Sequence, residues 1–442
     1  MKAIERARFP HSKIRLATLE SADSLNASST QIAAAALFAA ALLHVFLASR
    51  VGSLAKRFPS HAGVFHLLGE VEIVFGFWAA ILFLVRWVLE GASPAISDLE
   101  HLDFREPLFV FVVMVVAGSR PVLQAASGAV EAIARILPFP KAISFALVGL
   151  GVTPLLGSLI SEPAAMTIAA LLLRDSILVG GSSVRLRYAA IAVLFVNISI
   201  GGVLTSYAAP PVLMVADRWG WNTTFMAGTF GIRAVAAVLV NAMAFTLLFR
   251  RNLALISVPA PLKSRLVPTG LVMVHLAVLA GIVLASHHTV LFMGIFLLFL
   301  GLVQAYGKFH SPLLLREGLL VGFFLAGLVV LGSPQAWWLG PLVSRLGNGT
   351  LYLGAVGLTS VVDNAALTYL GSLIPGTSEA FRYYLVAGAV VGGGLTVIAN
   401  APNPAGASLL RAHLPGKVLE NGRLLLYALP PTLVALLAFA FR

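Results

Sequence analysis

Long apolar runs constrain the fold of this chain more than any other feature. Of its 442 residues, 59% are hydrophobic and only 11% are charged. Several uncharged runs reach the ~20 residues that are needed to cross the hydrocarbon of a bilayer, which excludes a soluble protein. Since lipid offers no hydrogen-bond partners, the backbone must pair within each segment. We therefore predict an all-α polytopic membrane protein that is embedded in the lipid bilayer.

The charges and the missing cysteines narrow the function. The formal net charge of +12 indicates Lys and Arg in cytoplasmic loops, and we expect no nucleic-acid partner. Because the sequence contains no cysteine, disulfides and thiolate metal sites are excluded. We expect no cofactor. Polar residues separate the basic N-terminus from the first apolar run, which predicts a basic tail rather than a signal peptide.

Composition divides the chain into five parts. They are a basic and polar tail (1–30), N-terminal and scaffold helices (31–104), a first repeat (105–250), linker and scaffold helices (251–315) and a second repeat (316–442). Uninterrupted apolar runs predict spanning helices at 31–49, 66–90, 107–123, 226–249, 267–286, 288–306, 316–332 and 423–441. An amphipathic stretch that ends near Leu137 should lie along the membrane surface.

Two segments are predicted to be re-entrant helical hairpins, which enter and leave the membrane on one side. The first, 141–174, has basic residues at both ends. It breaks at Ser161 to Pro163, since a proline cannot continue the hydrogen bonding of a preceding helix. The second, 350–375, contains Asp363. The 13 residues before this acid give a helix of ~20 Å, which is too short for a ~30 Å hydrocarbon core.

Each hairpin is followed by a helix that should break within the membrane. The segment 188–217 is interrupted at 205–211, where two adjacent prolines remove two backbone donors. The segment 381–412 is interrupted at 399–404, which contains two further prolines. Carbonyl groups freed in this way persist at membrane depth only where they line a cavity or bind a ligand.

The hairpins and the broken helices occur twice because one unit is duplicated. Residues 162–168 (EPAAMTI) parallel 363–369 (DNAALTY), and 201–211 and 392–402 share six of eleven residues. Upstream, the motif REPLFV recurs as REGLLV. Five predicted spans separate the starts of the two units, and an odd number makes the copies antiparallel. Inverted repeats with interrupted helices are typical of secondary transporters with a site near the midplane.

Basic residues suggest the orientation. The positive-inside rule places Lys141, Arg174 and the 250–265 loop in the cytoplasm, so the first hairpin should enter from that side. If 31–49 spans the membrane, the basic tail then lies outside. That placement of the tail conflicts with the same rule.

Two acids lie at the tips of the predicted hairpins. An ionised carboxylate at bilayer depth costs ~2.5–3.5 kcal/mol, so Glu162 and Asp363 are candidates for binding an ion or a proton. Hard cations prefer oxygen ligands. We expect the two acids to be joined by four further side chains, Asn364, Thr205, Thr396 and Asn400, and by carbonyl groups near the breaks. Burial and a second carboxylate both favour a protonated carboxyl group, so H+ and Na+, or another monovalent cation, would compete for the pair.

Six other polar residues are candidates for an accessory role: Glu70, Glu72, Ser161, Thr167, Thr368 and Asn403. The two glutamates lie near the start of the predicted span 66–90. They are either part of a proton relay, or acids that lie near the headgroups or pair with an arginine such as Arg120.

The motifs HLLGEVEIVFG, EPLFVFVVM, SEPAAMT and SVVDNAALT follow one another in this order. With the paired hairpins and broken helices, they resemble the ion transporter superfamily, which includes arsenite and dicarboxylate carriers, and within it the sodium/proton antiporters. The resemblance covers nearly the whole chain beyond Gln31. It implies a transporter rather than an enzyme, located in the bacterial inner membrane, and a homodimer that associates through the scaffold. The Ser-Asn-Thr motifs that dicarboxylate carriers have at both hairpin tips are missing from this sequence, which argues against a carboxylate as the transported substrate.

Other interpretations of the same residues stay open. Asp363 and Glu162 can instead cap the helices that follow them. The positive ends of those helices favour anions, which would suit a proton- or sodium-coupled carrier of anions or organic acids. An intramembrane hydrolase with an acidic pair is a third alternative, although the sequence has neither a zinc motif such as HExxH nor an evident water-activating partner.

Overall fold

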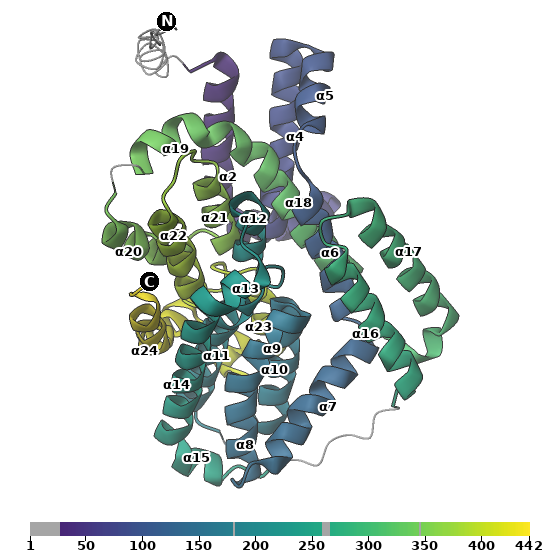
Figure 1. Cartoon of the computed structure of the whole chain (residues 1–442), viewed down its shortest axis with the longest axis vertical. Coiled ribbons are helices and arrows are strands. Elements are labelled where there is room, and N and C mark those ends of the chain that lie inside the picture. Colours follow the sequence, from purple (N-terminus) through teal and green to yellow (C-terminus); the bar gives the residue numbers. More distant parts are fainter. Residues whose placement is uncertain (1–26, 180–181, 259–265, 344–345) are drawn as a thin grey trace, which may run out of the picture.

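The computed structural model describes residues 27–179, 182–258, 266–343 and 346–442, and these residues form helices and no strand (Figure 1). In these ranges 7 helices are long and apolar enough to cross a membrane: Ser29–Ala48, Val71–Glu90, Lys141–Ile160, Val184–Leu204, Thr223–Leu248, Leu315–Val343 and Asn421–Phe439. The chain is therefore an all-α, multi-pass membrane protein, as predicted. Most of the predicted basic tail, Lys263 and Arg265 lie outside the described residues.

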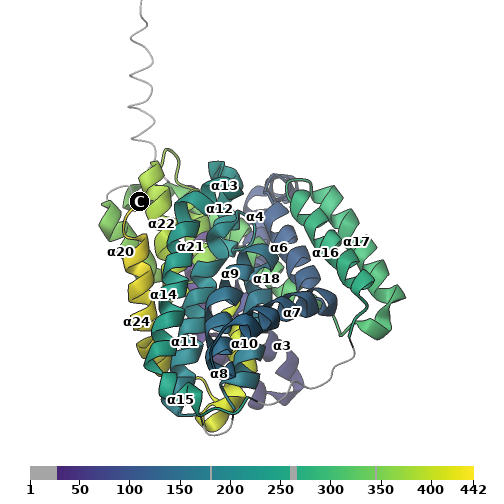
Figure 2. The same cartoon turned by 60° about the horizontal axis from the view of Figure 1, so that its bottom comes forward.

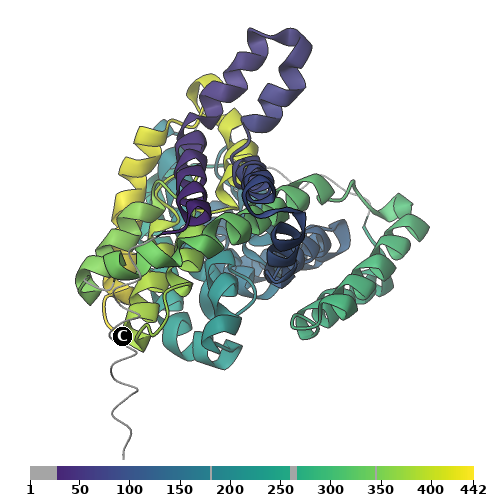
Figure 3. The same ribbon diagram turned by 90° about the horizontal axis from the view of Figure 1, so that it is seen from above.

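One group of helices forms the part of the molecule that we call the scaffold. Its members are α2 (Ser29–Ser53), α4 (Val71–Glu90), α6 (Arg105–Ala117), α16 (Thr269–Leu284), α17 (Thr289–Ala305) and α18 (Leu315–Gly332). Helix α18 packs against both α4 and α6, and α2 packs against α4. Figures 2 and 3 show α16 and α17 at the edge of the molecule. The scaffold thus includes α6 and α18, which open the two predicted repeats, in addition to helices of the predicted parts 31–104 and 251–315.

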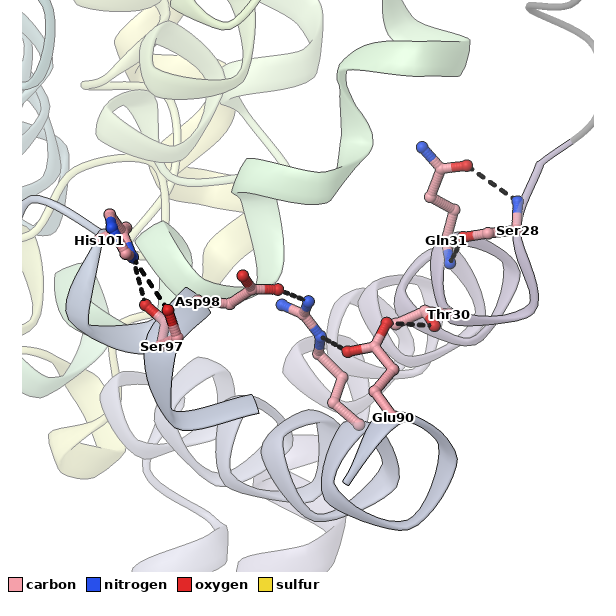
Figure 4. Close-up of polar contacts among 8 residues, drawn as sticks. Ser28, Thr30, Gln31, Glu90, Ser97, Asp98 and His101 are labelled. Atoms are coloured by element: carbon pink, nitrogen blue, oxygen red, sulfur yellow. Dashed lines mark hydrogen bonds and ion pairs between the residues drawn. The ribbon is translucent and has the colours of Figure 1, made fainter. Parts of the chain in front are cut away.

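Polar contacts join the ends of α2, α4 and the short helix α5 (Ala92–Glu100) (Figure 4). The Thr30 hydroxyl donates to Glu90 over 2.7 Å, and the Arg86 guanidinium donates to Glu90 over 3.1 Å. Arg86 also pairs with Asp98. The first turn of α2 therefore lies beside the last turn of α4, which makes the two helices antiparallel.

Two predicted spans have different bounds in the structure. The span predicted at 66–90 begins at Val71, because α3 (Ala62–Leu68) is a separate short helix. The span predicted at 107–123 ends at Ala117, and the chain bends by 67° into α7 (Arg120–Ile136). Gly118 and Ser119 separate the two helices, and Pro121 lies in the first turn of the second. A proline suits that position because the first turn of a helix needs no backbone donors.

Helices α6 and α18, which open the two predicted repeats, run antiparallel. A Cβ atom added at Gly318 would lie 3.0 Å from the Val115 side chain, whereas one at Gly322 would lie 3.3 Å from the carbonyl oxygen of Pro107. The contact therefore moves backwards along α6 as it moves forwards along α18. The absence of side chains at the two glycines allows this close packing.

The first predicted hairpin is a pair of helical arms separated by Ser161. The first arm is α8 (Lys141–Leu147), a π-helical turn (Val148–Val152) and α9 (Thr153–Ile160); the second arm is α10 (Glu162–Ser176). Helix α10 packs against every part of the first arm, so the chain reverses at Ser161. The first arm has 20 residues, enough by length and composition to cross a membrane. It is followed by α11 (Val184–Gly201), an irregular segment that includes 205–209, and α12 (Pro210–Trp219).

The second unit repeats this arrangement with shorter arms. It comprises α20 (Asn348–Thr359), α21 (Asn364–Ser372), α22 (Glu379–Gly392) and α23 (Asn403–Leu410). Helix α22 ends at Gly392, several residues before the predicted break at 399–404. Just after this end the chain passes close to α11, since a Cβ atom at Gly394 would lie 2.3 Å from the Cα atom of Val196. A side chain at this position would be excluded by the backbone of α11.

The core consists of the hairpin and the broken helix of each unit, together with α14 (Ile232–Leu248) and α24 (Asn421–Phe439). The second arm of each hairpin packs on the broken helix of the other unit, since α10 contacts α23 and α21 contacts α12. Three short helices complete the described part of the chain: α13 (Thr223–Met226), α15 (Arg250–Ala254) and α19 (Ala336–Val343). The cross-packing brings both hairpin tips to the centre of the core.

Candidate functional site

Glu162 lies at the tip of the first hairpin and is fully buried. Ser161 precedes it with φ 116°, a conformation that non-glycine residues seldom adopt and that is often found at functional sites. Glu162 Oε2 accepts a hydrogen bond of 2.9 Å from Asn400 Nδ2, while Oε1 is buried without a partner. A Cβ atom at Gly202 would lie 2.4 Å from Oε1, so only glycine leaves room for this carboxylate. The first tip therefore touches both broken helices.

Asp363 lies at the tip of the second hairpin and caps α21. Its Oδ1 accepts hydrogen bonds from the backbone N–H groups of Ala365 (2.8 Å) and Ala366 (3.3 Å). The next residue, Asn364, is fully buried, and neither polar atom of its side chain has a partner. Its backbone N–H donates to the carbonyl of Ala399 over 3.1 Å. The second tip is thus bound to the second broken helix. Asp363, unlike Glu162, is an N-cap.

The break after α22 joins the two tips. The carbonyl of Ala399 accepts a hydrogen bond from the backbone of the second tip, and the side chain of the adjacent Asn400 donates one to Glu162. Two neighbouring residues therefore hold the two tips. Asn403 Nδ2 donates to the carbonyls of Gly393 (2.8 Å) and Thr396 (2.9 Å), which holds the break in shape.

Five side-chain oxygens around the tips are buried and accept no hydrogen bond. They are Ser161 Oγ, Glu162 Oε1, Asn364 Oδ1, Asn400 Oδ1 and Asn403 Oδ1. A buried polar atom without a partner costs free energy, and native proteins contain few of them. Their concentration at two helix tips and one break is typical of a site that binds an ion or water.

The two predicted threonine ligands hold the breaks against the hairpins. The Thr205 hydroxyl donates to the carbonyl of Ser158 over 2.7 Å, and the Thr396 hydroxyl donates to the carbonyl of Ser360 over 2.8 Å. The two threonines are equivalent, and their acceptors lie within one residue of equivalent positions in the two hairpins. Because each hydroxyl donates its hydrogen to a carbonyl, its oxygen can still accept a cation as a ligand.

Thr167 and Thr368 bond to their own helices instead of reaching toward the tips. Thr167 donates to the carbonyl of Pro163 over 2.9 Å, and Thr368 donates to that of Ala365 over 3.2 Å. Both contacts lie within one helical turn. The structure therefore does not bring these two predicted accessory residues together with the acids.

Glu70 and Glu72 both lie near Arg316, but they differ in their other neighbours. Glu70 pairs with Arg316 at the start of α18. Glu72, in the first turn of α4, lies close enough to Asp363 for their charges to interact. A cavity of about 20 Å³, roughly the space of one water molecule, lies beside Asp363 and is bordered by apolar side chains of α2, α4 and α18. Only Glu72 of the two is therefore associated with the second tip.

Three buried polar residues near the site were not anticipated from the sequence. Ser158 Oγ donates to the carbonyl of Gly201 over 2.7 Å and accepts from the N–H of Leu204. Asn197 Nδ2 donates to the carbonyl of Leu150, in the π-helical turn, over 2.7 Å. Ser199 Oγ donates to the carbonyl of Val390 over 2.7 Å. Each lies within a long apolar run, which is the signal that could have identified it.

The oxygens of the site suit a monovalent cation better than a transition metal. The parts of the chain that the structure describes contain no group of three or more His, Cys, Asp and Glu side chains that could hold a metal ion. Two carboxylates with amide and hydroxyl oxygens are ligands that a hard cation prefers. An anion would need the N–H groups at the start of α21, two of which are already bound to Asp363.

Comparison with models of known protein families identifies a family for this chain. The model of the family described as "Putative Na+/H+ antiporter" matches residues 29–442, nearly the whole chain. A search of the curated proteins finds no match.

Proposed function

Because the chain belongs to the family described as "Putative Na+/H+ antiporter", a family of transporters and not of enzymes, we propose that it exchanges Na+ for H+ at Glu162 and Asp363. Another monovalent cation could replace Na+ in the same chemistry. The observation that carries the proposal is the group of five unpartnered oxygens at the two hairpin tips and the second break. Na+ would use these oxygens as ligands.

The exchange would follow from competition at the two carboxylates. When both acids are ionised, they and the amide oxygens of Asn364 and Asn400 offer a negative site to the cation. When the acids are protonated, the site is neutral and the cation leaves, because a buried charge needs a compensating charge. The protonated form is neutral, and the form with one bound cation carries a single negative charge, so both are less costly at membrane depth than the empty form. The empty, doubly charged form is costly, which couples the two fluxes.

Contacts between equivalent residues support an inverted repeat. The duplication aligns Ser199 with Val390, and the Ser199 hydroxyl donates to the Val390 carbonyl. It also aligns Phe111 with Gly322, where a Cβ atom would lie 3.2 Å from that of Phe111. Residues related by a two-fold axis touch their own equivalents only where the axis passes. We therefore propose re-entrant hairpins that enter from opposite sides, with both tips buried near the midplane.

The scaffold and the core would have different tasks. The core holds every proposed ligand, and its contacts with the scaffold include those of α21 with α18 and of α12 with α6. We propose that the loaded core moves against the scaffold, and that two copies associate through α16 and α17 at its edge. We place the chain in the bacterial inner membrane, with Lys141 and Arg174 on the cytoplasmic side.

Replacement of Asp363 tests the proposal. Asp363→Asn should abolish Na+-dependent proton movement in everted vesicles, because asparagine cannot ionise. It should still insert and fold, since asparagine is as good an N-cap as aspartate. Glu100→Gln, at an exposed acid, is the control and should behave as wild type. Activity of Asp363→Asn close to wild type would remove the carboxylate pair from the mechanism. Proton movement driven by small anions, and not by Na+, K+ or Li+, would instead favour an anion carrier.

A further inference from the structure

A large cavity lies between the scaffold and the first broken helix. Its volume is about 690 Å³, and the first turn of α6, the break after α11, helices α12 and α13, and the turn between α16 and α17 line it. In Figures 1 and 2, α12 and α13 lie at the end of the core away from α8 and α15. We call this cavity the vestibule. It is therefore remote from the basic residues that we assign to the cytoplasmic side.

The vestibule reaches the break that adjoins Glu162. Ser206 and Tyr207 line it, and they directly follow Thr205, which is bound to the first hairpin. Gly202, at the other end of the same short segment, touches the Glu162 carboxylate. The wall of the vestibule and the proposed ion site are thus two parts of one break.

The charges of the vestibule are uneven. Arg105 pairs with Asp217 over 2.8 Å and with Asp103 over 2.7 Å, so its positive charge is offset twice. His287 also contacts Asp217, over 3.1 Å. Burial alone would raise the pKa of Asp103, but hydrogen bonds from Arg105 outweigh it and lower the pKa, so this acid stays ionised.

Glu106 is the remaining acid of the vestibule wall. Within the described ranges its carboxylate forms no ion pair and no hydrogen bond with the side chain of another residue. With Arg105 offset by two aspartates, the carboxylate of Glu106 adds to a surplus of negative charge. A cleft of one sign between low-dielectric walls raises the local concentration of counter-ions. The vestibule therefore suits cations.

The equivalent region of the second repeat borders a much smaller cavity. Tyr207 aligns with Ile398, and Ile398 borders the cavity of about 20 Å³ beside Asp363. Glu106 aligns with Glu317, which is exposed. The two entrances thus differ in size and in charge, although the sequence that builds them is duplicated.

We infer that the vestibule is the entrance through which the transported cation reaches the Glu162 tip from the side opposite the cytoplasm, and that Glu106 draws the cation into it. This inference rests on the proposed exchange. It adds the route by which the cation enters, and it adds Glu106 as a residue that sets the apparent affinity for the cation on one side of the membrane. It assigns no ligand role at the final site to Glu106.

Cysteine accessibility tests the route without any need for transport. Because the chain has no cysteine, single replacements can be labelled without background. Ser206→Cys should react with a membrane-impermeant methanethiosulfonate added from the side opposite the cytoplasm, and Na+ should slow the reaction. Val397→Cys, at the equivalent position, should not react from that side. Thr224→Cys, which also lines the vestibule, replaces Ser206→Cys if the latter does not fold. Two unreactive vestibule cysteines in folded protein would overturn the inference.

Kinetics test the role of Glu106. Glu106→Gln should raise the KM for Na+ supplied from that side by roughly tenfold and leave kcat near wild type, because it weakens attraction and not the final site. Glu317→Gln is the matched control and should leave KM unchanged. An unchanged KM in Glu106→Gln would overturn its role. If Ser206→Cys reacts as expected but wild-type protein exchanges no cation, the proposed function fails while the vestibule stands.

Discussion

At the residue scale, the site is a set of buried side-chain oxygens that have no hydrogen-bond partner in the protein. Asn400 shows this most clearly, because its amide nitrogen is held by Glu162 while its amide oxygen is buried and unpartnered. The hydrogen bond therefore orients the amide so that the oxygen faces away from the carboxylate. Glu162 Oε1 is free in the same way. Asn400 and Glu162 each use one polar atom to hold the other side chain in place and leave one oxygen available for a ligand.

Competition between H+ and Na+ for these oxygens gives a pH dependence with a definite sign. Lower pH protonates the carboxyl groups, so the cation must displace protons and its KM should rise. The rise should be at most about tenfold per pH unit for each proton displaced. Glu162→Gln keeps an acceptor for Asn400 but loses one proton site, so its slope should be smaller.

Binding of radioactive sodium to purified protein over a range of pH measures this slope even where exchange is lost. Glu100→Gln should keep the wild-type slope. An affinity for sodium that does not change with pH would contradict direct competition.

At the element scale, the positions of helix ends depend on close backbone contacts. Helices α20 and α22 pack along each other, and a Cβ atom at Gly388 would lie 2.6 Å from the carbonyl oxygen of Tyr352. Gly354, in α20, would meet nothing within 4 Å. Glycine is thus required at position 388, whereas position 354 has room for a larger residue.

This difference predicts opposite effects of two alanine replacements. Gly388→Ala should destabilise the protein by about 1–3 kcal/mol, because the added methyl group overfills a packed contact. Gly354→Ala should leave stability unchanged or raise it, since alanine favours the helix. Thermal unfolding in detergent, followed by tryptophan fluorescence, measures both. Equal melting temperatures for Gly388→Ala and wild type would contradict this prediction, because they would show that α20 and α22 can move apart to admit the methyl group at little cost.

At the scale of the whole molecule, the proposed inversion makes each hairpin open to one side only. The ends of the first hairpin are Lys141 and Asp175, and the second extends from Asn348 to Pro375; all four residues are exposed. In a re-entrant hairpin both ends lie on one face of the membrane. In an inverted pair the two faces differ.

Four single-cysteine variants test this topology. Cysteines at Lys141 and Asp175 should react with an impermeant reagent from the cytoplasmic side, and those at Asn348 and Pro375 from the other side. Labelling of right-side-out and everted vesicles gives the comparison. If Lys141 and Asp175 react from opposite sides, the first hairpin crosses the membrane, which the 20-residue length of its first arm would permit.

The sequence by itself determined the membrane class, the family resemblance and the residues at which helices break. These depend on local costs: lipid excludes charges and unpaired backbone groups, so acids and prolines within apolar runs are informative wherever the chain goes. It was less accurate about the exact ends of helices, since α22 ends at Gly392, several residues before the predicted break.

Only the tertiary structure decided which polar groups meet. Glu162 and Asn400 are 238 residues apart, and their hydrogen bond depends on how two distant segments cross. Thr167 and Thr368 occupy matching places in the repeated motif, yet both bond to their own helices. The vestibule and its small counterpart likewise differ although their sequences are related. A motif specifies local chemistry, whereas a hydrogen bond between distant segments depends on the packing of the entire chain.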